Sequence, residues 1–263
     1  MPNKTTRRNG GKIRLDRLMF EKGLTESREK AKAIILGGNV LVNGLTVDKA
    51  GEMVKESASI EVLKKLPYVS RGGIKLEEAI KSFNVSVKDK TAMDVGASTG
   101  GFTDCLLQNG AERVYAVDVG YGQFSWRLRN DPRVVLLEKT NIRYLEKNAI
   151  KDSIDISTID VSFISLLKVI PNVLKFLSPG KEIIALIKPQ FEAGRKDVGK
   201  GGVIRDETIR QDVIGKIRDW AVNMGLDVRG IIKSPITGPK GNIEYLIYLI
   251  HNSSEAKAHR HIG

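Results

Sequence analysis

The residues between 94 and 118 have the types and spacing needed to hold a nucleoside. The loop Asp94–Gly101 follows an apolar segment and contains three glycines, which let the backbone turn sharply and approach a ligand without Cβ clashes. A helix after this loop would offer free N–H groups. Asp118 ends the next apolar segment, where its carboxylate can accept hydrogen bonds from both ribose hydroxyls. This order predicts a nucleoside site and favours it over a strand–helix turn without a ligand.

The glycine spacing distinguishes between nucleoside cofactors. It reads G-x-x-x-G-G rather than the dinucleotide pattern G-x-G-x-x-G, and Asp94 stands two residues before the first glycine. A carboxylate there would repel a pyrophosphate but attract the cationic amine and sulfonium of S-adenosylmethionine. The spacing therefore favours S-adenosylmethionine over NAD.

A second glycine-rich segment, Gly194–Lys200, imitates a phosphate-binding loop. The residue that follows is Gly201 rather than Ser or Thr, so no hydroxyl is available for magnesium. We interpret Gly194–Gly202 as a mobile basic loop, either a plain surface loop or a substrate lid, and infer no nucleotide hydrolysis from it.

A methyl group needs an acceptor, and the residues favour a hydroxyl. The position where base-amino methyltransferases usually carry a Pro-Pro aromatic motif reads Asp160–Phe163, without proline. Transfer to a pyrimidine carbon needs a cysteine nucleophile, and we expect the single cysteine, Cys105, to be packed in the core. A ribose 2′-hydroxyl remains, and a lysine can take its proton only if the lysine pKa falls from about 10.4 towards neutrality.

The candidates for this proton chemistry stand at the ends of expected elements. Lys188 follows one expected strand and precedes Pro189, Asp160 follows another, Lys75 lies in an expected helix, and Glu244 opens the last strand. Taken singly, each reads more simply as a member of a surface ion pair. Two lysines and two acids in one pocket would instead balance charge while tuning one amine.

The elements that would position these residues alternate between short apolar strands and amphipathic helices. This alternation predicts a mostly parallel sheet with helices on both faces, in which ligands bind at the carboxyl ends of the strands. A helix is expected over Ile74–Phe83. Strands are expected at Ala92–Val95, Val114–Val119, Val134–Leu137, Ile154–Ile159, Ile183–Ile187, Gly230–Ser234 and Tyr245–Ile250.

The first quarter of the chain reads as a separate small α+β unit. A helix is expected from Lys12 to Gly23, and a second from Thr25 or Ser27 to Gly37-Gly38. Asn43-Gly44 between two apolar runs predicts a hairpin, and a strand is expected at Ser59–Leu63. We place a disordered basic tail at 1–11, this unit at 12–64, a linker at 65–70, the sheet domain at 71–250 and a polar tail at 251–263.

Charge and composition restrict the partners. The 263 residues carry a net charge of +12, which favours a polyanion, either nucleic acid or an acidic membrane surface. Residues 1–70 hold 14 Lys and Arg against 8 Asp and Glu, which is half of that excess. One cysteine excludes an internal disulfide and a zinc cluster, and we expect no metal. The apolar runs are too short to span a membrane, so we expect a cytoplasmic protein.

Together the motifs resemble the TlyA family of ribosomal RNA 2′-O-methyltransferases, sometimes labelled hemolysins, over about residues 12–250. The resemblance is carried by Val69–Gly73, Asp94–Gly101, Asp118–Gln123, Asp160–Leu166 and Lys188–Phe191. It implies an FtsJ-type, Rossmann-like sheet of seven strands whose last strand is antiparallel, preceded by the small RNA-binding domain. It also implies a catalytic group of Lys75, Asp160, Lys188 and Glu244.

Roles and binding residues follow from the same resemblance. Lys188 would accept the proton, Lys75 would be the neighbouring cation that favours its neutral form, and the two acids would orient the lysines and the ribose. The implied cofactor residues are Asp94, Gly96, Ala97, Ser98, Gly100, Gly101, Asp118, Val119, Asn141 and Asp160.

The first unit resembles the alpha-L RNA-binding module. Its paired helices would present basic side chains to phosphates, which position a protein without choosing a nucleotide. The implied RNA-binding residues are Lys12, Arg14, Arg17, Arg28, Lys32 and, in the second unit, Arg71.

The expected substrate is a cytidine ribose in ribosomal RNA, with ribosomal subunits as partners. By the same resemblance, the residues before Lys12 favour activity on both subunits, because family members with extra N-terminal residues are associated with the broader range. A membrane-active hemolysin and a non-catalytic RNA-binding or assembly factor are the competing interpretations.

Overall fold

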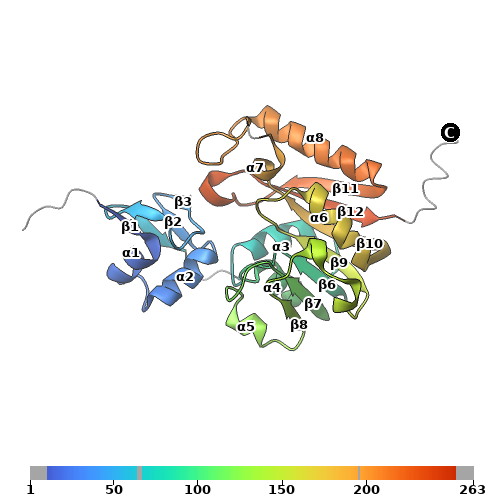
Figure 1. Ribbon diagram of the computed structural model, residues 1–263, viewed down its shortest axis with the longest axis horizontal. Helices are drawn as coiled ribbons and strands as arrows, with labels where there is room; N and C mark the ends of the chain where they lie inside the picture. The colour runs from blue at the N-terminus through green and yellow to red at the C-terminus, as the bar shows by residue number, and fades with distance from the viewer. Residues whose placement is uncertain (1–10, 64–66, 195, 253–263) are drawn as a thin grey trace, which may run out of the picture. The chain divides into compact units, whose positions relative to one another are not determined.

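A computed structural model describes residues 11–63, 67–194 and 196–252 (Figure 1). The chain divides into two compact units, Met1–Leu66 and Pro67–Gly263. The tails expected at 1–11 and 251–263 lie almost wholly outside the described residues, as does the start of the expected linker.

The first unit packs two helices against short antiparallel strands. The strand β1 pairs with β4, and a separate sheet has the order β3-β2-β5. Ser27 caps the second helix by accepting a hydrogen bond from the backbone N–H of Lys30 at 3.1 Å. Asn43 and Gly44 both have positive φ, 50° and 78°, as the expected hairpin turn requires. The elements are β1 (Lys12–Arg14), α1 (Leu15–Glu21), α2 (Arg28–Leu36), β2 (Val40–Val42), β3 (Leu45–Thr46), β4 (Met53–Lys55) and β5 (Ile60–Val62).

The expectation that the first helix begins at Lys12 is wrong. Lys12–Arg14 form a strand, in which Ile13 lies opposite Val54, and the helix begins at Leu15. A three-residue strand is too short for its apolar period to be told from that of a helix.

The second unit contains the expected α/β sheet of seven strands, in the order β11-β12-β10-β9-β6-β7-β8. Strands β6 to β10 are parallel, and β12 is antiparallel to both of its neighbours, so an antiparallel last strand is confirmed. The elements are α3 (Gly72–Ser82), β6 (Thr91–Val95), α4 (Gly101–Gln108), β7 (Arg113–Val117), α5 (Trp126–Arg129), β8 (Val134–Leu137), β9 (Ile154–Ile159), α6 (Leu166–Val173), β10 (Leu177–Ile187), α7 (Pro189–Glu192), α8 (Glu207–Asn223), β11 (Leu226–Lys233) and β12 (Tyr245–His251).

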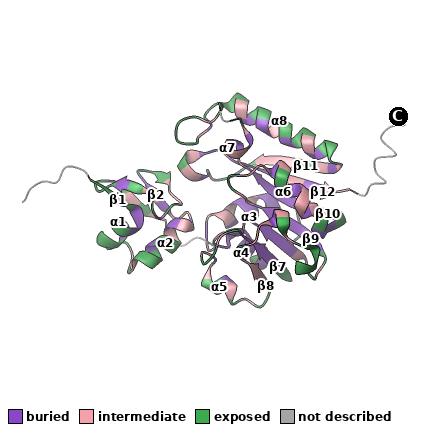
Figure 2. Cartoon of the chain, in the orientation of Figure 1, coloured by how far each residue is buried: buried purple, intermediate pink, exposed green. Residues whose placement is uncertain are grey.

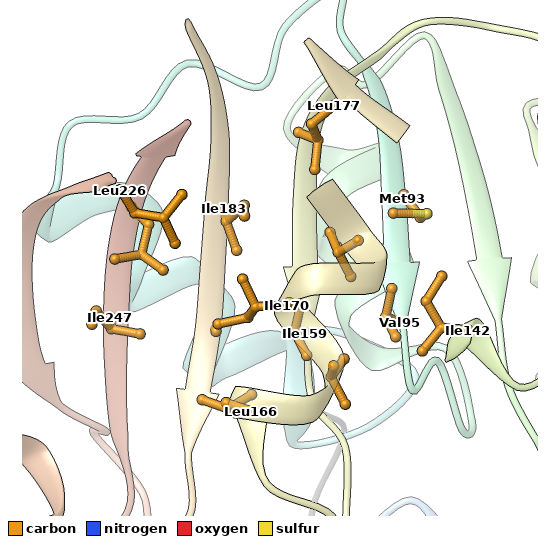
Figure 3. Packing of buried hydrophobic residues seen from close by; sticks show 14 of the residues in the cluster. Met93, Val95, Ile142, Ile159, Leu166, Ile170, Leu177, Ile183, Leu226 and Ile247 are labelled. Carbon is orange, nitrogen blue, oxygen red and sulfur yellow. The ribbon is translucent and has the colours of Figure 1, made fainter. Parts of the chain in front are cut away.

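Helices cover both faces of this sheet, and its central strands are buried between them, whereas the edge strands β8 and β11 are mostly half-buried (Figure 2). One face packs against α6, around Ile170 and Ile183 (Figure 3), and against α8, which contributes Ile217. The other packs against α3 and α4 around Leu76 and Leu106. A parallel strand covered on both faces needs apolar residues in succession, which explains runs such as Ile183–Ile187.

Residues 67–70, expected to be a linker, lie against the second unit. The backbone N–H of Val69 donates to Asp104 at 2.8 Å, and Gln108 donates to the carbonyl of Pro67 at 3.0 Å. Both partners are on α4, directly after the glycine loop.

None of the helices in the described ranges has the length and apolar composition needed to cross a bilayer.

Candidate active site

The loop between β6 and α4 is shaped by glycines that no other residue could replace. Gly96 and Gly100 have φ of +87° and +95°, and Ser98 also has a positive φ of 49°. A Cβ at Gly96 would lie 2.3 Å from the carbonyl oxygen of Asp160, and one at Gly100 would lie 2.5 Å from Leu128. The loop is therefore held open and close to the end of β9, as a ligand-binding turn requires.

Asp118, directly after β7, faces this loop. One carboxylate oxygen accepts from the backbone N–H of Ser98 at 2.7 Å, and the other accepts from that of Gly120 at 2.6 Å. The oxygen bonded to Gly120 also accepts from the Gln123 amide at 3.2 Å, whereas the oxygen bonded to Ser98 can accept a further hydrogen bond. Asp118 can therefore order the loop and still accept from a ribose hydroxyl.

Asp94 does not face the loop opening. Its side chain is fully buried, with hydroxyl donors Thr103 at 2.7 Å and Thr158 at 3.1 Å on its two oxygens. Burial raises the pKa of Asp94 to about 7, against the lowering effect of the two hydroxyls. The structure therefore places Asp94 as a brace between β6, α4 and β9.

The other expected cofactor residues surround the loop. Val119 is mostly exposed, beside Asp118, and Ala97 is buried. A Cβ at Gly101 would lie 2.1 Å from the hydroxyl of Ser70, so this glycine lets residues 67–70 approach α4. Asn141 follows β8, and its side chain accepts from the backbone N–H of Arg143 at 3.1 Å.

The four expected catalytic residues form two ion pairs at the carboxyl edge of the sheet. The Nζ of Lys75, on α3, lies 2.6 Å from Glu244 Oε2, at the start of β12, and Glu244 is only 1% exposed. The Nζ of Lys188, after β10, lies 2.6 Å from Asp160 Oδ1, after β9, and 2.9 Å from the Ser162 hydroxyl. Taken singly, each of these residues suggested an ion pair at the surface. In the structure the Lys75–Glu244 pair is buried and the Lys188–Asp160 pair is half-buried.

The two pairs interact with each other. Burial alone would lower the pKa of Lys75, but the charges of Glu244 and Asp160 outweigh it and raise that pKa. Burial alone would raise the pKa of Asp160, but the charges of Lys188 and Lys75 outweigh it and lower that pKa. Lys75 is therefore held as a cation and Asp160 as an anion within the expected catalytic group.

Arg71, expected to bind RNA, lies beside this group. Its guanidinium donates to the carbonyl of Thr237 at 3.3 Å, and burial lowers its pKa while Glu244 partly opposes that shift.

Cys105, in α4, is fully buried as expected, and burial raises the pKa of its thiol to about 12. A thiol in that state is not a nucleophile.

Glu192 is a site residue that the sequence did not indicate. Its buried carboxylate accepts from the backbone N–H of Leu166 at 2.7 Å and from the hydroxyl of Ser165, the N-cap of α6. It therefore joins α7, which follows Lys188, to the first turn of α6, which follows Asp160. A capping residue can be recognised in a sequence when it stands next to its helix. Glu192 is 26 positions away from Leu166, so no local pattern indicates it.

A hollow of about 460 Å³ opens next to the Lys188–Asp160 pair, lined by Phe163, Gln190, Phe191, Ala193 and Val198. The rings of Phe163 and Phe191 have centroids 4.8 Å apart, and Lys188 Nζ lies 6.0 Å from the Phe191 centroid. Phe163 is 78% exposed with a positive φ of 64°. The sequence signal was present, since both phenylalanines lie in motifs that also carry the expected catalytic residues Asp160 and Lys188.

In the first unit, the expected RNA-binding arginines are mostly paired. Arg14 and Arg28 both bond the carboxylate of Asp16, which is 1% exposed, at 2.9 and 3.1 Å. Arg14 lies on β1 rather than on a helix, and Arg17 pairs with Glu21 at 2.6 Å. Lys12 and Lys32 are exposed.

Residues 68–251 match the model of the FtsJ-like methyltransferase family, and residues 13–60 match that of the S4 domain. The 16S/23S rRNA (cytidine-2′-O)-methyltransferase TlyA of Mycobacterium tuberculosis is 41% identical over 90% of this chain and 90% of its own length. The chain belongs to the TlyA family. The expected α/β fold, methyltransferase class and S-adenosylmethionine cofactor are confirmed by this membership.

Two other proteins are more similar in sequence to this chain. YqxC of Bacillus subtilis, provisionally named an rRNA methyltransferase, is 51% identical over 90% of this chain and 85% of its own length. A solved structure from Streptococcus thermophilus, described as a hemolysin, is 46% identical and has a TM-score of 0.73, covering 93% of this chain and 90% of that one.

The residues present fit the cofactor of this family. The glycines leave no room for side chains where a ligand would approach, and Asp118 retains acceptor capacity for a ribose. Gly96 lies against the backbone of Asp160, so the cofactor loop adjoins the catalytic group.

Proposed function

We propose that this protein methylates the 2′-hydroxyl of a cytidine ribose in ribosomal RNA, with a ribosomal subunit as its partner. The observation that carries the proposal is the Lys188–Asp160 pair, which lies against the glycine loop on one side and the hollow on the other. The names of the relatives support the choice of rRNA and of cytidine. Since that partner is cytoplasmic, we propose the cytoplasm as the site of action.

The hollow supports a nucleotide as the ligand. Its volume is within the range of small-molecule sites, and two phenylalanine rings offer flat faces for a base. A base held there would leave its ribose near Lys188.

Each charged residue has a separate part in the proposed reaction. Lys188, as the free amine, accepts the proton of the 2′-hydroxyl, and Asp160 stabilises the ammonium that forms. Lys75, held as a cation by Glu244, helps to keep Asp160 ionised, so that its carboxylate can stabilise that ammonium. Ser162 fixes the direction of the Lys188 side chain. S-adenosylmethionine, when bound through Asp118 and the glycine loop, supplies the electrophilic methyl group.

The first prediction concerns Lys188→Ala. Loss of a general base should lower kcat by about 10²- to 10⁴-fold, while the cofactor Kd stays unchanged because no atom of the glycine loop is altered. The assay uses tritiated S-adenosylmethionine with separated ribosomal subunits that lack the modification, and the label is mapped by reverse-transcription stops.

The same strand offers a matched control. Lys181, on β10, lies 2.6 Å from Asp155 just as Lys188, directly after β10, lies 2.6 Å from Asp160, but seven residues earlier in the chain. Lys181→Ala should leave kcat unchanged. Normal turnover by Lys188→Ala would remove Lys188 from its assigned role.

A further inference from the structure

Two exposed tyrosines of the second unit each carry a cation over the ring. Tyr121 is 71% exposed, with Lys139 Nζ 4.4 Å from its ring centroid. Tyr144 is 75% exposed, with Arg143 Cζ 5.1 Å from its ring centroid. A single exposed tyrosine is ordinary, but exposed aromatic side chains that cluster can mark a binding site.

The two pairs come from the adjoining segments that follow β7 and β8. The backbone N–H of Lys139 donates to Gly120 at 3.0 Å, and that of Thr140 donates to Asp118 at 2.9 Å. These bonds join the segments after β7 and β8 at the carboxyl edge of the sheet. We call Tyr121, Lys139, Arg143 and Tyr144 the tyrosine–cation surface.

The charges of this surface are available to an outside anion. Within the described ranges, neither Lys139 nor Arg143 is paired with a carboxylate. Nearby arginines behave differently: Arg127, Arg129 and Arg133 lie 2.6, 2.8 and 2.8 Å from acids. The two cations over the tyrosines thus keep their charge for a phosphate.

Exposed rings combined with unpaired cations match the chemistry of single-stranded nucleic acid. Bases stack on aromatic faces, and the backbone phosphates pair with the cations. We propose that the tyrosine–cation surface binds single-stranded RNA nucleotides that adjoin the methylated one, with bases on Tyr121 and Tyr144 and phosphates on Lys139 and Arg143.

This inference rests on the proposed function, because the same RNA must also reach Lys188. Strand β8 is four positions from β10 in the sheet, which corresponds to about 20 Å along the carboxyl edge. An RNA strand of several nucleotides would therefore pass the cofactor loop on its way between the two sites.

The test measures binding of the full chain to a fluorescein-labelled, single-stranded 12-nucleotide cytidine RNA by anisotropy. Tyr144→Ala should weaken binding about 5- to 100-fold, and Tyr144→Phe should retain the wild-type Kd because the ring is kept. Arg143→Gln should lower the slope of log Kd against log salt by about 0.7. The control Arg133→Gln removes a paired arginine and should leave that slope unchanged.

Two further measurements separate the alternatives. S-adenosylmethionine Kd, measured calorimetrically, should be the same in Tyr144→Ala as in the wild type. If Tyr144→Ala weakened cofactor binding but not RNA binding, the surface would serve the cofactor and the proposal would be overturned. An equal loss of affinity for a 12-base-pair RNA duplex would overturn base stacking.

If Tyr144→Ala and Arg143→Gln both bound RNA with the Kd and the salt dependence of the wild type, the proposal would be overturned outright. Failure of the proposed function looks different, because RNA binding would still depend on Tyr144 while no methyl group reached either ribosomal subunit. That result would support the surface and reject the assigned reaction.

Discussion

Asp94 shows how a single residue can make stability depend on pH. With its pKa raised to about 7, the folded chain keeps the Asp94 proton between about pH 4 and pH 7, where the unfolded chain has lost it. The folded state therefore binds more protons, and its stability falls as the pH rises through this window.

We predict that Asp94→Asn removes this fall. The unfolding free energy of the variant relative to the wild type should increase by up to about 1.4 kcal/mol per pH unit between pH 4 and 7, then level off. Urea unfolding followed by tryptophan fluorescence measures it, since Trp126 and Trp220 both lie in the second unit. A difference that does not change with pH would contradict the shifted pKa.

At the residue scale, the sequence indicated which side chains stand at the ends of strands, but not how they pair. The link of Lys75 to Glu244 and of Lys188 to Asp160 depends on the order of the strands in space, which no local pattern contains. The buried environment of Asp94 was missed for a related reason. An acid before a glycine loop suggests contact with the ligand, whereas the hydroxyls that hold it come from α4 and β9.

At the scale of elements, Glu192 holds together the two loops that carry Lys188 and Asp160. We predict that Glu192→Ala lowers the unfolding free energy by about 1 kcal/mol, as loss of a helix cap does. It should also lower kcat/KM about 10- to 100-fold, because displaced loops misplace the reacting groups. Glu192→Gln keeps an oxygen for the Leu166 N–H and should restore most of both quantities.

The measurement is methyl transfer together with cofactor affinity, which should not change in either variant. Equal kcat/KM in Glu192→Ala and wild type would show that the loops keep their places without this carboxylate. A Glu192→Gln variant as impaired as Glu192→Ala would indicate that the charge of Glu192, rather than its hydrogen bond, is needed.

The elements themselves were largely predictable because their periods are clear. All seven strands of the sheet were expected, although the predicted starts of β10 and β11 came too late. The exposed residues Ser178, Pro179 and Gly180 hide the beginning of β10 from an apolar pattern. Short elements such as β1 and α7 carry too few residues for a period to be recognised.

At the scale of the whole molecule, the excess positive charge is less available than its count suggests. Arg14 and Arg28 both hold buried Asp16, whose pKa their hydrogen bonds and charges lower to about 2. This ion-pair network contributes stability above about pH 4 and loses it as the pH falls towards 2. These arginines therefore hold the first unit together, whatever they contribute to RNA binding.

We predict that Arg28→Glu and Lys32→Glu behave differently, although they are close neighbours on α2. Arg28→Glu places a second acid beside Asp16 and should speed amide hydrogen exchange across residues 12–63, measured by mass spectrometry. Lys32→Glu should leave exchange unchanged and weaken RNA binding in a salt-dependent way. Unchanged RNA affinity of Lys32→Glu at low salt would leave α2 without a role in binding.

The Lys75–Glu244 pair has a consequence for the time at which the enzyme becomes active. Its two members are 169 residues apart, so Lys75 leaves the translating ribosome long before Glu244 has been polymerised. Until β12 emerges, the lysine lacks the carboxylate that makes its burial tolerable. A nascent chain therefore cannot close the proposed catalytic centre until Glu244 has left the ribosome and β12 has joined the sheet.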